Sequence, residues 1–422
     1  RQSDFSLDGR TSGAPWLGMK VTDFFDLKSI LFIGTNLRKD HPLIAARIRK
    51  AIKLGAQVSL LNPFEGDPTL RFSHRMIVAP SQMADALAEI VGAAQSSETN
   101  AIAAHLREAQ PAAVLLGNLA THHPQYSQLH TLAQKLARLT GAKFGFLGEA
   151  ANSVGAYLAK AAPFSSSPHG MNCGEMLAKP RRAYLLLGVE PELDCYDSRQ
   201  ATAAMRQAEL VVAMSPYRAA DYAHVMLPIA PFTETAGAFV NCEGRAQSFK
   251  AAVPPLGETR PGWKVLRVLG NHLKLAGFDF DTVEAIREEI ARETMPLNNE
   301  VSQQNPLVPA PAFDKGRLKG ALERIGDVPI YAADAIARRS PPLQETRDAR
   351  EPVAAMRASI IERYALREGD RVRLKQIGGD ACLVIERDDS LPDNCIRVAA
   401  GHPLTSNLGP MFGEISIERV DE

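Results

Sequence analysis

The residues best placed for chemistry follow runs that predict β-strands. Gly34-Thr35-Asn36 follows the apolar run 30–33, and Gly188-Val189-Glu190 follows the run 183–187. Open parallel sheets bind ligands beyond the carboxyl ends of their strands, where a glycine lets a phosphate approach the backbone in front of a helix. The first turn has one glycine where a dinucleotide-binding fingerprint has three, so by itself it is a weak signal for such a site.

A second candidate region is the polar, glycine-punctuated stretch 227–263. It contains Glu234 and then Asn241-Cys242-Glu243-Gly244-Arg245. Asn241, Glu243 and Arg245 could form a hydrogen-bonded brace, which is a structural role, or they could donate to a buried polar cofactor. The residue types favour the brace.

Histidines and cysteines give weaker signals for a metal or thiol site. Thr121-His122-His123-Pro124 and His130 lack a carboxylate or thiolate at ligand spacing, which predicts surface or loop histidines rather than ligands. Cys173 could be a reactive thiol, but a bystander is the favoured interpretation. The five cysteines (173, 195, 242, 382 and 395) are too far apart for a CxxC metal knuckle and predict reduced thiols.

The elements that must position these residues alternate between strand and helix. The run 30–33, helical spacing over 42–53, Gly55 as a C-cap glycine and the run 58–61 predict one parallel βαβ unit. The pattern recurs over 113–146, where Gly141 ends the helix. Such alternation predicts an α/β fold with a mainly parallel, doubly wound sheet.

A second round of strands and helices begins at Ala183. It comprises the run 183–187, a helix over 201–208, a strand over 210–214 and a strand from His224 that stops at Pro228. Gly34 and Gly188 sit at the same place in the two rounds, 154 residues apart. We therefore predict two related α/β units in tandem, with a single large sheet as the alternative.

The last third of the chain changes texture. Eight prolines in the 63 residues 290–352 predict a connector. Short alternating runs from 371 to 418 then predict a small β-barrel. The predicted organisation is a lead-in over 1–29, α/β domains over 30–180 and 181–289, the connector 290–352, and a barrel over 353–422.

Composition narrows the class of protein. The chain has 422 residues, of which 45% are hydrophobic, and its 48 Lys and Arg balance 48 Asp and Glu. This balance disfavours a general nucleic-acid binder. No apolar run approaches the ~18 residues of a membrane span and no signal peptide is evident, so we expect no direct membrane span. Because residue 1 is Arg rather than Met, we expect a fragment of a longer polypeptide.

The chain resembles the molybdopterin oxidoreductase superfamily and, within it, the large iron–sulfur (G-type) subunits of respiratory complex I, the NADH–quinone oxidoreductase. The resemblance covers nearly the whole chain and rests on four stretches. These are Ile33-Gly34-Thr35-Asn36 through Pro42, Arg47 and Gly55 to Asn62-Pro63; 148–156; the series Leu227, Pro228, Glu234, Gly237, Asn241, Glu243, Gly244, Arg245, Gln247 and Trp263; and Pro329-Ile330-Tyr331 with Asp334, Arg338, Arg339, Leu343 and Gln344.

The resemblance implies two Rossmann-like, doubly wound domains related by pseudo-symmetry and a small C-terminal β-barrel. It implies a structural and assembly role in a complex that passes electrons from NADH to quinone, with other peripheral-arm subunits as partners, at the cytoplasmic face of the bacterial inner membrane. Iron–sulfur clusters would lie upstream of Arg1, because this sequence lacks a close group of cysteines. The fragment itself would then be redox-silent and carry no cofactor.

Under that interpretation the site residues are vestigial and hold no catalytic group and no metal. They are Gly34, Asn36, Asn62, Gly188, Glu234, Asn241, Glu243 and Arg245. Two alternatives remain open. The chain could be part of a formate dehydrogenase-type enzyme that binds a molybdopterin guanine dinucleotide, or a module that binds a small molecule between its two α/β units.

Overall fold

The first domain is built on a five-stranded parallel sheet. The computed structural model describes residues 1–7, 14–66, 69–96, 100–161, 170–293, 297 and 320–420. The sheet has the order β3-β2-β1-β4-β5. Its strands are β1 (Ser29–Ile33), β2 (Gln57–Asn62), β3 (His74–Ile77), β4 (Ala112–Leu116) and β5 (Lys143–Phe146). The chain reverses direction along the sheet between β1 and β4, which makes the carboxyl ends of these strands a topological switch point.

Helices cover both faces of this sheet. On one face, α3 (Met83–Ser96), α4 (Ala101–Glu108) and α6 (Tyr126–Thr140) pack on Leu31, Val114 and Leu116. On the other face, α2 (Pro42–Lys53) packs on Ile30 and Phe32. Alternate residues of β1 therefore serve opposite cores, and all five are buried, as expected for a central parallel strand. The glycines predicted to end α2 and α6 have positive φ angles, 95° at Gly55 and 70° at Gly141.

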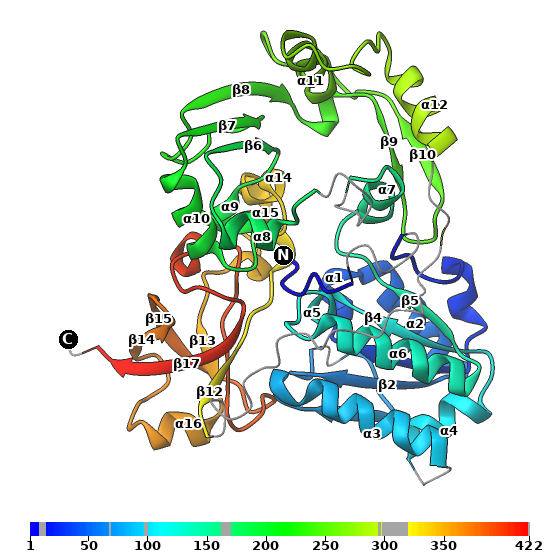
Figure 1. Ribbon diagram of the computed structural model, residues 1–422. Helices are drawn as coiled ribbons and strands as arrows, with labels where there is room; N and C mark the ends of the chain where they lie inside the picture. Colours follow the sequence, from blue (N-terminus) through cyan, green and yellow to red (C-terminus); the bar gives the residue numbers. More distant parts are fainter. Residues whose placement is uncertain are drawn as a thin grey trace.

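The second domain has a smaller parallel sheet with the order β11-β8-β7-β6. Its strands are β6 (Ala183–Leu187), β7 (Leu210–Ser215), β8 (Val225–Ala230) and β11 (Arg260–Pro261). The two sheets are separate, which confirms the tandem arrangement over the single large sheet (Figure 1). Helices α8 (Cys173–Ala178), α9 (Pro191–Asp194) and α10 (Ser198–Gln207) belong to this domain, and α11 (Gly262–His272) and α12 (Val283–Glu293) follow it.

The C-terminal part is a closed six-stranded barrel with the order β12-β16-β13-β15-β14-β17. Its strands are β12 (Leu322–Ile325), β13 (Ala354–Met356), β14 (Arg371–Gln376), β15 (Gly379–Arg387), β16 (Cys395–Arg397) and β17 (Phe412–Arg419). The barrel has its own apolar interior, which includes Val372, Leu374 and Ile396, and helix α16 (Ala358–Arg363) contributes Ile360. The α/β fold with parallel sheets and a C-terminal barrel is thereby confirmed.

The remaining described elements are short. They are the α-helices α1 (Leu37–Asp40), α5 (Asn118–Thr121), α7 (Ser153–Leu158), α14 (Ala335–Arg338) and α15 (Pro341–Gln344); the hairpin strands β9 (Gly237–Val240) and β10 (Ala246–Phe249); and the 3-10 turns Val21–Phe25, Pro80–Gln82, Phe232–Glu234, Ile330–Ala332, Arg347–Ala349 and Pro403–Thr405.

The structure corrects two sequence expectations. The connector predicted over 290–352 contains β12, whose four residues are buried and which closes the barrel between β16 and β17. The sequence did not reveal this strand, because it spans just four residues within a proline-rich stretch. The strand expected to stop at Pro228 continues to Ala230. Its outer neighbour β11 pairs with Ile229 and Ala230, so the outer edge of β8 is unpaired at Pro228, where proline is tolerated.

The hairpin β9–β10 leaves the second domain and reaches the first (Figure 1). Val240 N donates to Asn152 Oδ1 at 2.8 Å, and Leu17 N donates to Cys242 O at 2.7 Å. The predicted domains 30–180 and 181–289 are therefore in direct contact through this hairpin.

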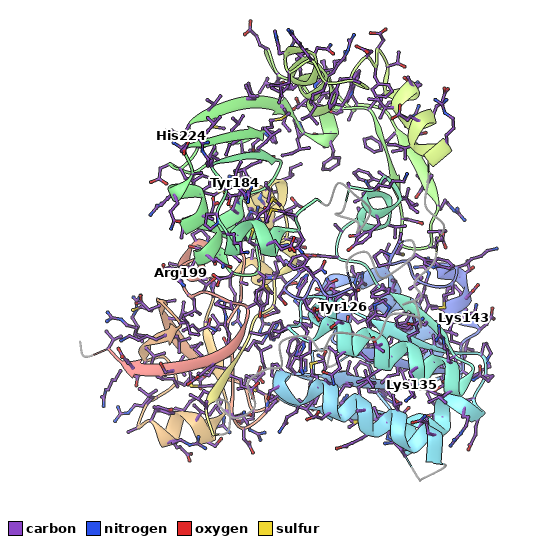
Figure 2. All side chains as sticks on the ribbon, in the orientation of Figure 1. Tyr126, Lys135, Lys143, Tyr184, Arg199 and His224 are labelled. Carbon is purple, nitrogen blue, oxygen red and sulfur yellow. The ribbon has the colours of Figure 1, made fainter. Side chains whose placement is uncertain are left out.

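The barrel is joined to both α/β domains. An apolar cluster containing Phe64 and Leu119 of the first domain meets Ile325 and Phe412 of the barrel. On the other side, Ser198 Oγ donates to Ser406 O at 2.6 Å, close to Arg199, which Figure 2 labels on α10 beside the barrel. Throughout the described ranges, the structure contains no helix that is both long and apolar enough to cross a bilayer.

Candidate functional site

The turn after β1 is built tightly against the rest of the switch point. Gly34 has a φ of 64°, and a Cβ at this position would lie 2.4 Å from Ala120 N in α5. Asn62, fully buried at the end of β2, accepts from Thr35 N at 2.8 Å and donates to Phe64 O at 2.7 Å. Gly34 and Asn62 therefore shape the backbone of this turn, and their contacts leave Asn36 to face the space beyond the sheet.

Asn36 is 8% exposed, and its Oδ1 has no hydrogen-bond partner among the described residues. It lines two adjacent cavities. The inner one, of about 40 Å³, lies beyond β1 and β4 and is walled by Asn118 and by Arg1, Glu149 and Ile330. This volume suits a water molecule or two, whereas ligand pockets occupy several hundred Å³.

The outer cavity, of about 910 Å³, lies between the first domain, the barrel and the segment that precedes β13. Six basic and six acidic side chains line it: Arg38, Lys39, Arg347, Arg350, Arg387 and Arg397, with Asp327, Asp348, Glu351, Glu368, Glu386 and Asp388. Several of these charges are paired across the cavity wall. Arg397 forms two hydrogen bonds to Asp327 at 3.0 and 2.5 Å, Arg350 forms two to Glu386, and Lys39 contacts Asp348.

Two carboxyl groups at this edge, those of Asp40 and Glu149, have strongly shifted pKa values. Burial and the neighbouring Asp327 raise the pKa of Asp40 to about 7. On the opposite wall Arg1 lies 2.9 Å from Glu149, and His122 Nε2 lies 3.0 Å from the other oxygen of Glu149. Burial would raise the pKa of Glu149, but the attraction and hydrogen bond from His122, together with the charge of Arg1, outweigh burial and hold this pKa well below its usual value.

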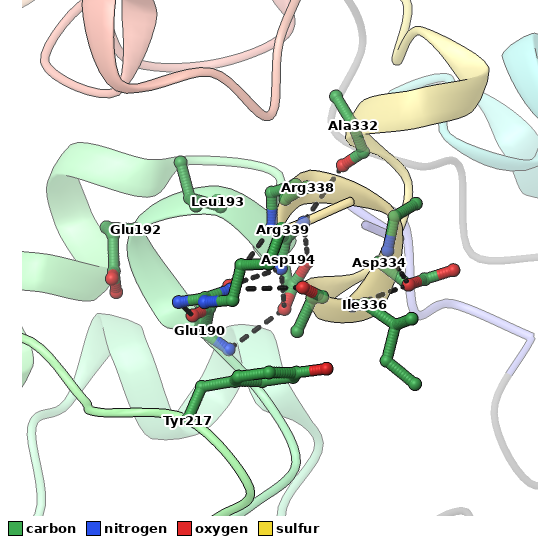
Figure 3. Close-up of polar contacts among 12 residues, drawn as sticks. Glu190, Glu192, Leu193, Asp194, Tyr217, Ala332, Asp334, Ile336, Arg338 and Arg339 are labelled. Carbon is green, nitrogen blue, oxygen red and sulfur yellow. Dashed lines mark hydrogen bonds and ion pairs between the residues drawn. The ribbon is translucent and has the colours of Figure 1, made fainter. Parts of the chain in front are cut away.

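The corresponding turn of the second sheet is filled by charged side chains (Figure 3). Gly188 has a φ of 61° and is followed by Glu190, which is 7% exposed. Glu190 Oε2 accepts from Arg338 Nη2 at 2.6 Å, and its other oxygen contacts Arg339. Arg338 Nη1 also reaches Asp194 Oδ1 at 3.0 Å. The helix α14 thereby seals the carboxyl end of β6.

The electrostatics of this cluster are mutually consistent. Burial alone would raise the pKa of Glu190, but hydrogen bonds from Arg339 and Arg338 outweigh it and lower the pKa. The pKa of Arg338 is raised by Asp194 and Glu190 despite burial. Arg339 also stacks its guanidinium over the ring of Tyr217, 4.5 Å from the centroid. These shifts hold both Glu190 and Arg338 in their charged forms.

The predicted hydrogen-bonded brace is present at the tip of the β9–β10 hairpin. Asn241 Oδ1 accepts from Arg245 N at 2.9 Å and from Glu243 N at 3.2 Å. Glu243 Oε1 lies 3.4 Å from Arg245 Nε, and its Oε2 accepts from Val21 N at 2.8 Å. The brace closes the tip of the hairpin and fastens it to the lead-in segment.

The eight predicted site residues thus fall into separate places. Gly34, Asn36 and Asn62 share the switch point of the first sheet, and Gly188 lies at the end of β6 in the second. Asn241, Glu243 and Arg245 share the hairpin tip, and Glu234 accepts from Leu256 N at 2.9 Å in a loop after β8. These contacts are local to each place.

The prediction of surface or loop histidines is right only in part: His122 and His123 lie in the connection between α5 and α6, but none of the three histidines lies at the surface. All three are buried. His123 bonds to Pro80 O at 2.9 Å, and His130 stacks on Phe144 with ring centroids 5.2 Å apart. His130 lies on the inner side of α6, and the connection between α5 and α6 places His122 and His123 inside the domain. Among the described residues, no group of three His, Cys, Asp or Glu side chains could hold a metal ion.

Sequence reasoning did not select several residues that shape these sites. Glu190, Arg338 and Arg339 were visible in the compared turns and in the fourth resemblance stretch, but no spacing rule links residues 148 positions apart. Asp40 could have been found by comparison with Asp194, since the two lie 154 residues apart, like Gly34 and Gly188. Arg1 and Glu149 carried no such signal.

Comparison with known proteins shows which family the chain matches. The model of the molybdopterin oxidoreductase family matches residues 4–272. The G-type subunit of the NADH-quinone oxidoreductase of Streptomyces coelicolor is 25% identical over 98% of this chain and 53% of its own length. The chain thus spans about half the length of this curated relative.

Two further similarities are more limited in what they show. A Staphylococcus aureus protein with a provisional formate dehydrogenase name is 40% identical over 77 residues, 18% of this chain and 8% of that protein. The acetylene hydratase of Pelobacter acetylenicus has a TM-score of 0.64 at 13% identity, covering 99% of this chain and 80% of that chain. At this identity the likeness concerns the fold alone.

Proposed function

Because the chain belongs to the molybdopterin oxidoreductase family, we propose that it is a scaffold portion of a G-type subunit of NADH–quinone oxidoreductase. In this role it binds other peripheral-arm subunits at the cytoplasmic face of the bacterial inner membrane. Electrons pass from NADH to quinone through iron–sulfur clusters held elsewhere, and this chain carries no redox group. Similarity to the Streptomyces coelicolor subunit over 98% of the chain supports the assignment.

The observation that carries the redox-silent part of the proposal is the filling of both carboxyl-end turns. At the first turn, Arg1 and Ile330 reduce the inner space to about 40 Å³. At the second, Arg338 and Arg339 occupy the carboxylate of Glu190. A pterin dinucleotide needs several hundred Å³ and hydrogen-bonding groups free to receive it. The residues at these turns do not fit that group, and no step of the proposed function passes through it.

The second candidate is a molybdopterin-dependent oxidoreductase of the formate dehydrogenase type. Two observations favour it: the 40% identity to the Staphylococcus aureus protein over 77 residues, and the unpartnered Oδ1 of Asn36 beside the 910 Å³ cavity. The cavity is large enough for a cofactor-sized ligand. Its paired Arg and Asp or Glu side chains are poorly suited to a diphosphate, because Arg350 and Arg397 already have an anionic partner close by.

The test is to purify the tagged chain from membranes of its own organism under mild detergent. We expect it to copurify with the other subunits of NADH–quinone oxidoreductase, and a deletion strain to lose NADH–quinone activity. The same preparation, stripped of its partner subunits, should lack molybdenum, tungsten and pterin fluorescence. Near-stoichiometric molybdenum or tungsten with pterin would contradict the scaffold proposal and favour the second candidate.

A further inference from the structure

Among the described residues, one face of the second parallel sheet has no complete covering layer. On the other face, Tyr184 and Leu186 of β6 and Val211 of β7 form an apolar cluster with residues of α8 and α10. Exposure alternates along β6, so Leu185 and Leu187 point away from this cluster, and they are 46% and 52% exposed. Parallel sheets are normally covered on both faces, because their strands are apolar on both sides.

This face extends over three strands. In the register of the sheet, Leu185 lies beside Val212 of β7, and Val212 lies beside Val225 of β8. Val225 is exposed and Val212 is half-buried. A continuous apolar patch of this kind is typical of an interaction site, unlike single apolar residues scattered over a surface. Six side chains form this face, the open face: Leu185, Leu187, Leu210, Val212, Val225 and Leu227.

Helix α11 covers the open face at its carboxyl end alone. A Cβ added to Gly262, the first residue of α11, would lie 3.7 Å from Leu187 Cδ1 and 3.6 Å from Ile229 Cδ1. Figure 1 shows α11 beside β8, away from β6. Leu185 lies on β6, two residues before Leu187 and so further from α11. The part of the open face around Leu185 and Val212 is therefore exposed.

The first sheet shows what covers the equivalent face. Leu185 and Leu187 correspond to Leu31 and Ile33, each 154 residues earlier in the chain. In the first domain these two residues are fully buried in a cluster with residues of α3, α4 and α6. Helix α2 covers the opposite face there, as α10 does in the second domain. The two domains therefore share one helix-covered face and differ in the other.

The dimensions of the open face fit a single helix. Neighbouring strands lie about 4.8 Å apart, so β6, β7 and β8 together span ~10 Å, close to the diameter of one helix. Strands of five and six residues are about 17–20 Å long, the length of a helix of roughly 12 residues. A second copy of the chain would bury about 800 Å² on each partner, which is more than six partly exposed side chains provide.

We propose that the open face binds an amphipathic helix of about three turns, from the part of a G-type subunit that this chain does not contain. The chain matches 53% of the length of the Streptomyces coelicolor subunit, so that relative has further polypeptide from which such a helix can come. Apolar side chains on one side of the helix would pack on Leu185, Val212 and Val225 and remove them from water. This assignment of the partner rests on the proposed function.

The test places a photo-reactive group on the open face of the tagged chain, in the complex purified from membranes of its own organism. Leu185→p-benzoylphenylalanine should cross-link to a peptide that matches the rest of the Streptomyces coelicolor subunit, outside the region similar to this chain. That peptide should have apolar residues at intervals of three and four. The matched control is p-benzoylphenylalanine at Leu54, which is 61% exposed after α2 and should not link to the same peptide.

A second measurement reads the apolar contact itself. With the photo-reactive group at Val225, the additional change Leu185→Asp should lower the yield of the cross-link at least about tenfold, because binding would bury an unpaired carboxylate. Leu54→Asp should leave the yield unchanged. Because both leucines are exposed, both variants should keep the circular dichroism spectrum of the wild type. An unchanged yield in Leu185→Asp would contradict a helix packed on the open face.

Copurification with the other subunits of NADH–quinone oxidoreductase tests the proposed function separately. If the chain copurifies with them and Leu185 forms no link outside the chain, the proposed function stands and the open face does not bind the helix. A link to a second copy, to another segment of the same chain or to a different subunit would also overturn the proposal. If the chain does not copurify with them, the proposed function fails and the assignment of the partner fails with it.

Discussion

Asn36 and Glu190 occupy equivalent positions in the two sheets. Each precedes a four-residue helix after the strand that begins its domain, and each backbone N–H donates to an aspartate four residues later, at 3.4 Å for Asp40 and 2.9 Å for Asp194. The preceding glycines also match, since the N–H groups of Gly34 and Gly188 bond to the end of the adjacent strand at 2.9 and 2.8 Å. One backbone design therefore presents an amide at the first turn and a carboxylate at the second.

This difference predicts that Glu190 is important for stability. Glu190→Gln should lower the free energy of unfolding by about 3 kcal/mol, because it removes one partner of a buried ion pair and leaves Arg338 and Arg339 less well neutralised. Urea unfolding at pH 7 measures this loss. The control is Arg182→Met, in the exposed pair with Glu209, for which we expect a much smaller loss because solvent screens an exposed ion pair. Equal losses in both variants would contradict a buried junction.

The matched glycines give a second prediction. Gly188→Ala should destabilise by about 1–2 kcal/mol, the cost of a left-handed residue, because a Cβ there has open space around it. Gly34→Ala should lose an additional ~1–3 kcal/mol, because its Cβ would overlap Ala120 N. Thermal and urea unfolding of the two variants would compare the cost of the left-handed backbone alone with that cost plus the overlap with Ala120. A larger loss at Gly188 would contradict the close approach of α5 to the first turn.

Much of the fold could be predicted from the sequence because its strands are strongly apolar and regularly spaced. The runs 30–33 and 183–187 are strands, and the repeat 154 residues apart is a true structural equivalence. The strand β12 was missed because four residues between prolines give little periodicity. The reach of the β9–β10 hairpin into the first domain was missed because it depends on tertiary contacts such as Val240 N to Asn152.

The candidate site was less predictable for a related reason. Asn241, Glu243 and Arg245 are near in sequence, and their brace follows from local hydrogen-bonding chemistry. Glu190 and Arg338 are far apart in sequence, and two charges of opposite sign have no signature until the fold brings them together. The burial of the three histidines was not predicted for the same reason, since it depends on how α5, α6 and the connection between them pack in the folded domain.

The brace predicts how the hairpin is held on the first domain. Glu243→Ala should free Val21 N and loosen the hairpin tip, because the carboxylate bridges the tip to the lead-in segment. Limited proteolysis should then cut within 237–249 faster than in the wild type. Glu243→Gln keeps an acceptor oxygen and should remain close to wild-type protection. Equal protection in Glu243→Ala would mean that Leu17 N to Cys242 O holds the hairpin on its own.

Asp40 predicts a pH dependence of stability with a defined sign. The unfolded chain loses the Asp40 proton near pH 3.8, whereas the folded chain keeps it until about pH 7. Between these values the folded state binds more protons, so the contribution of Asp40 to the free energy of unfolding falls with rising pH, by at most about 1.4 kcal/mol per pH unit. Above pH 7 it should be constant.

Asp40→Asn removes this dependence and retains an oxygen that can accept from Asn36 N. The stability of the variant relative to wild type should therefore rise from pH 4 to pH 7 and then level off, as measured by urea unfolding across that range. Asp23→Asn is the opposite control. Its hydrogen bond from Lys143 lowers the pKa of Asp23, so the wild-type advantage at that site is present at neutral pH and disappears as the pH falls. The opposite result would be a difference in the free energy of unfolding between Asp40→Asn and wild type that does not change with pH. It would mean that Asp40 is ionised in the folded chain, because the ion pair between Asp327 and Arg397 neutralises the charge of Asp327.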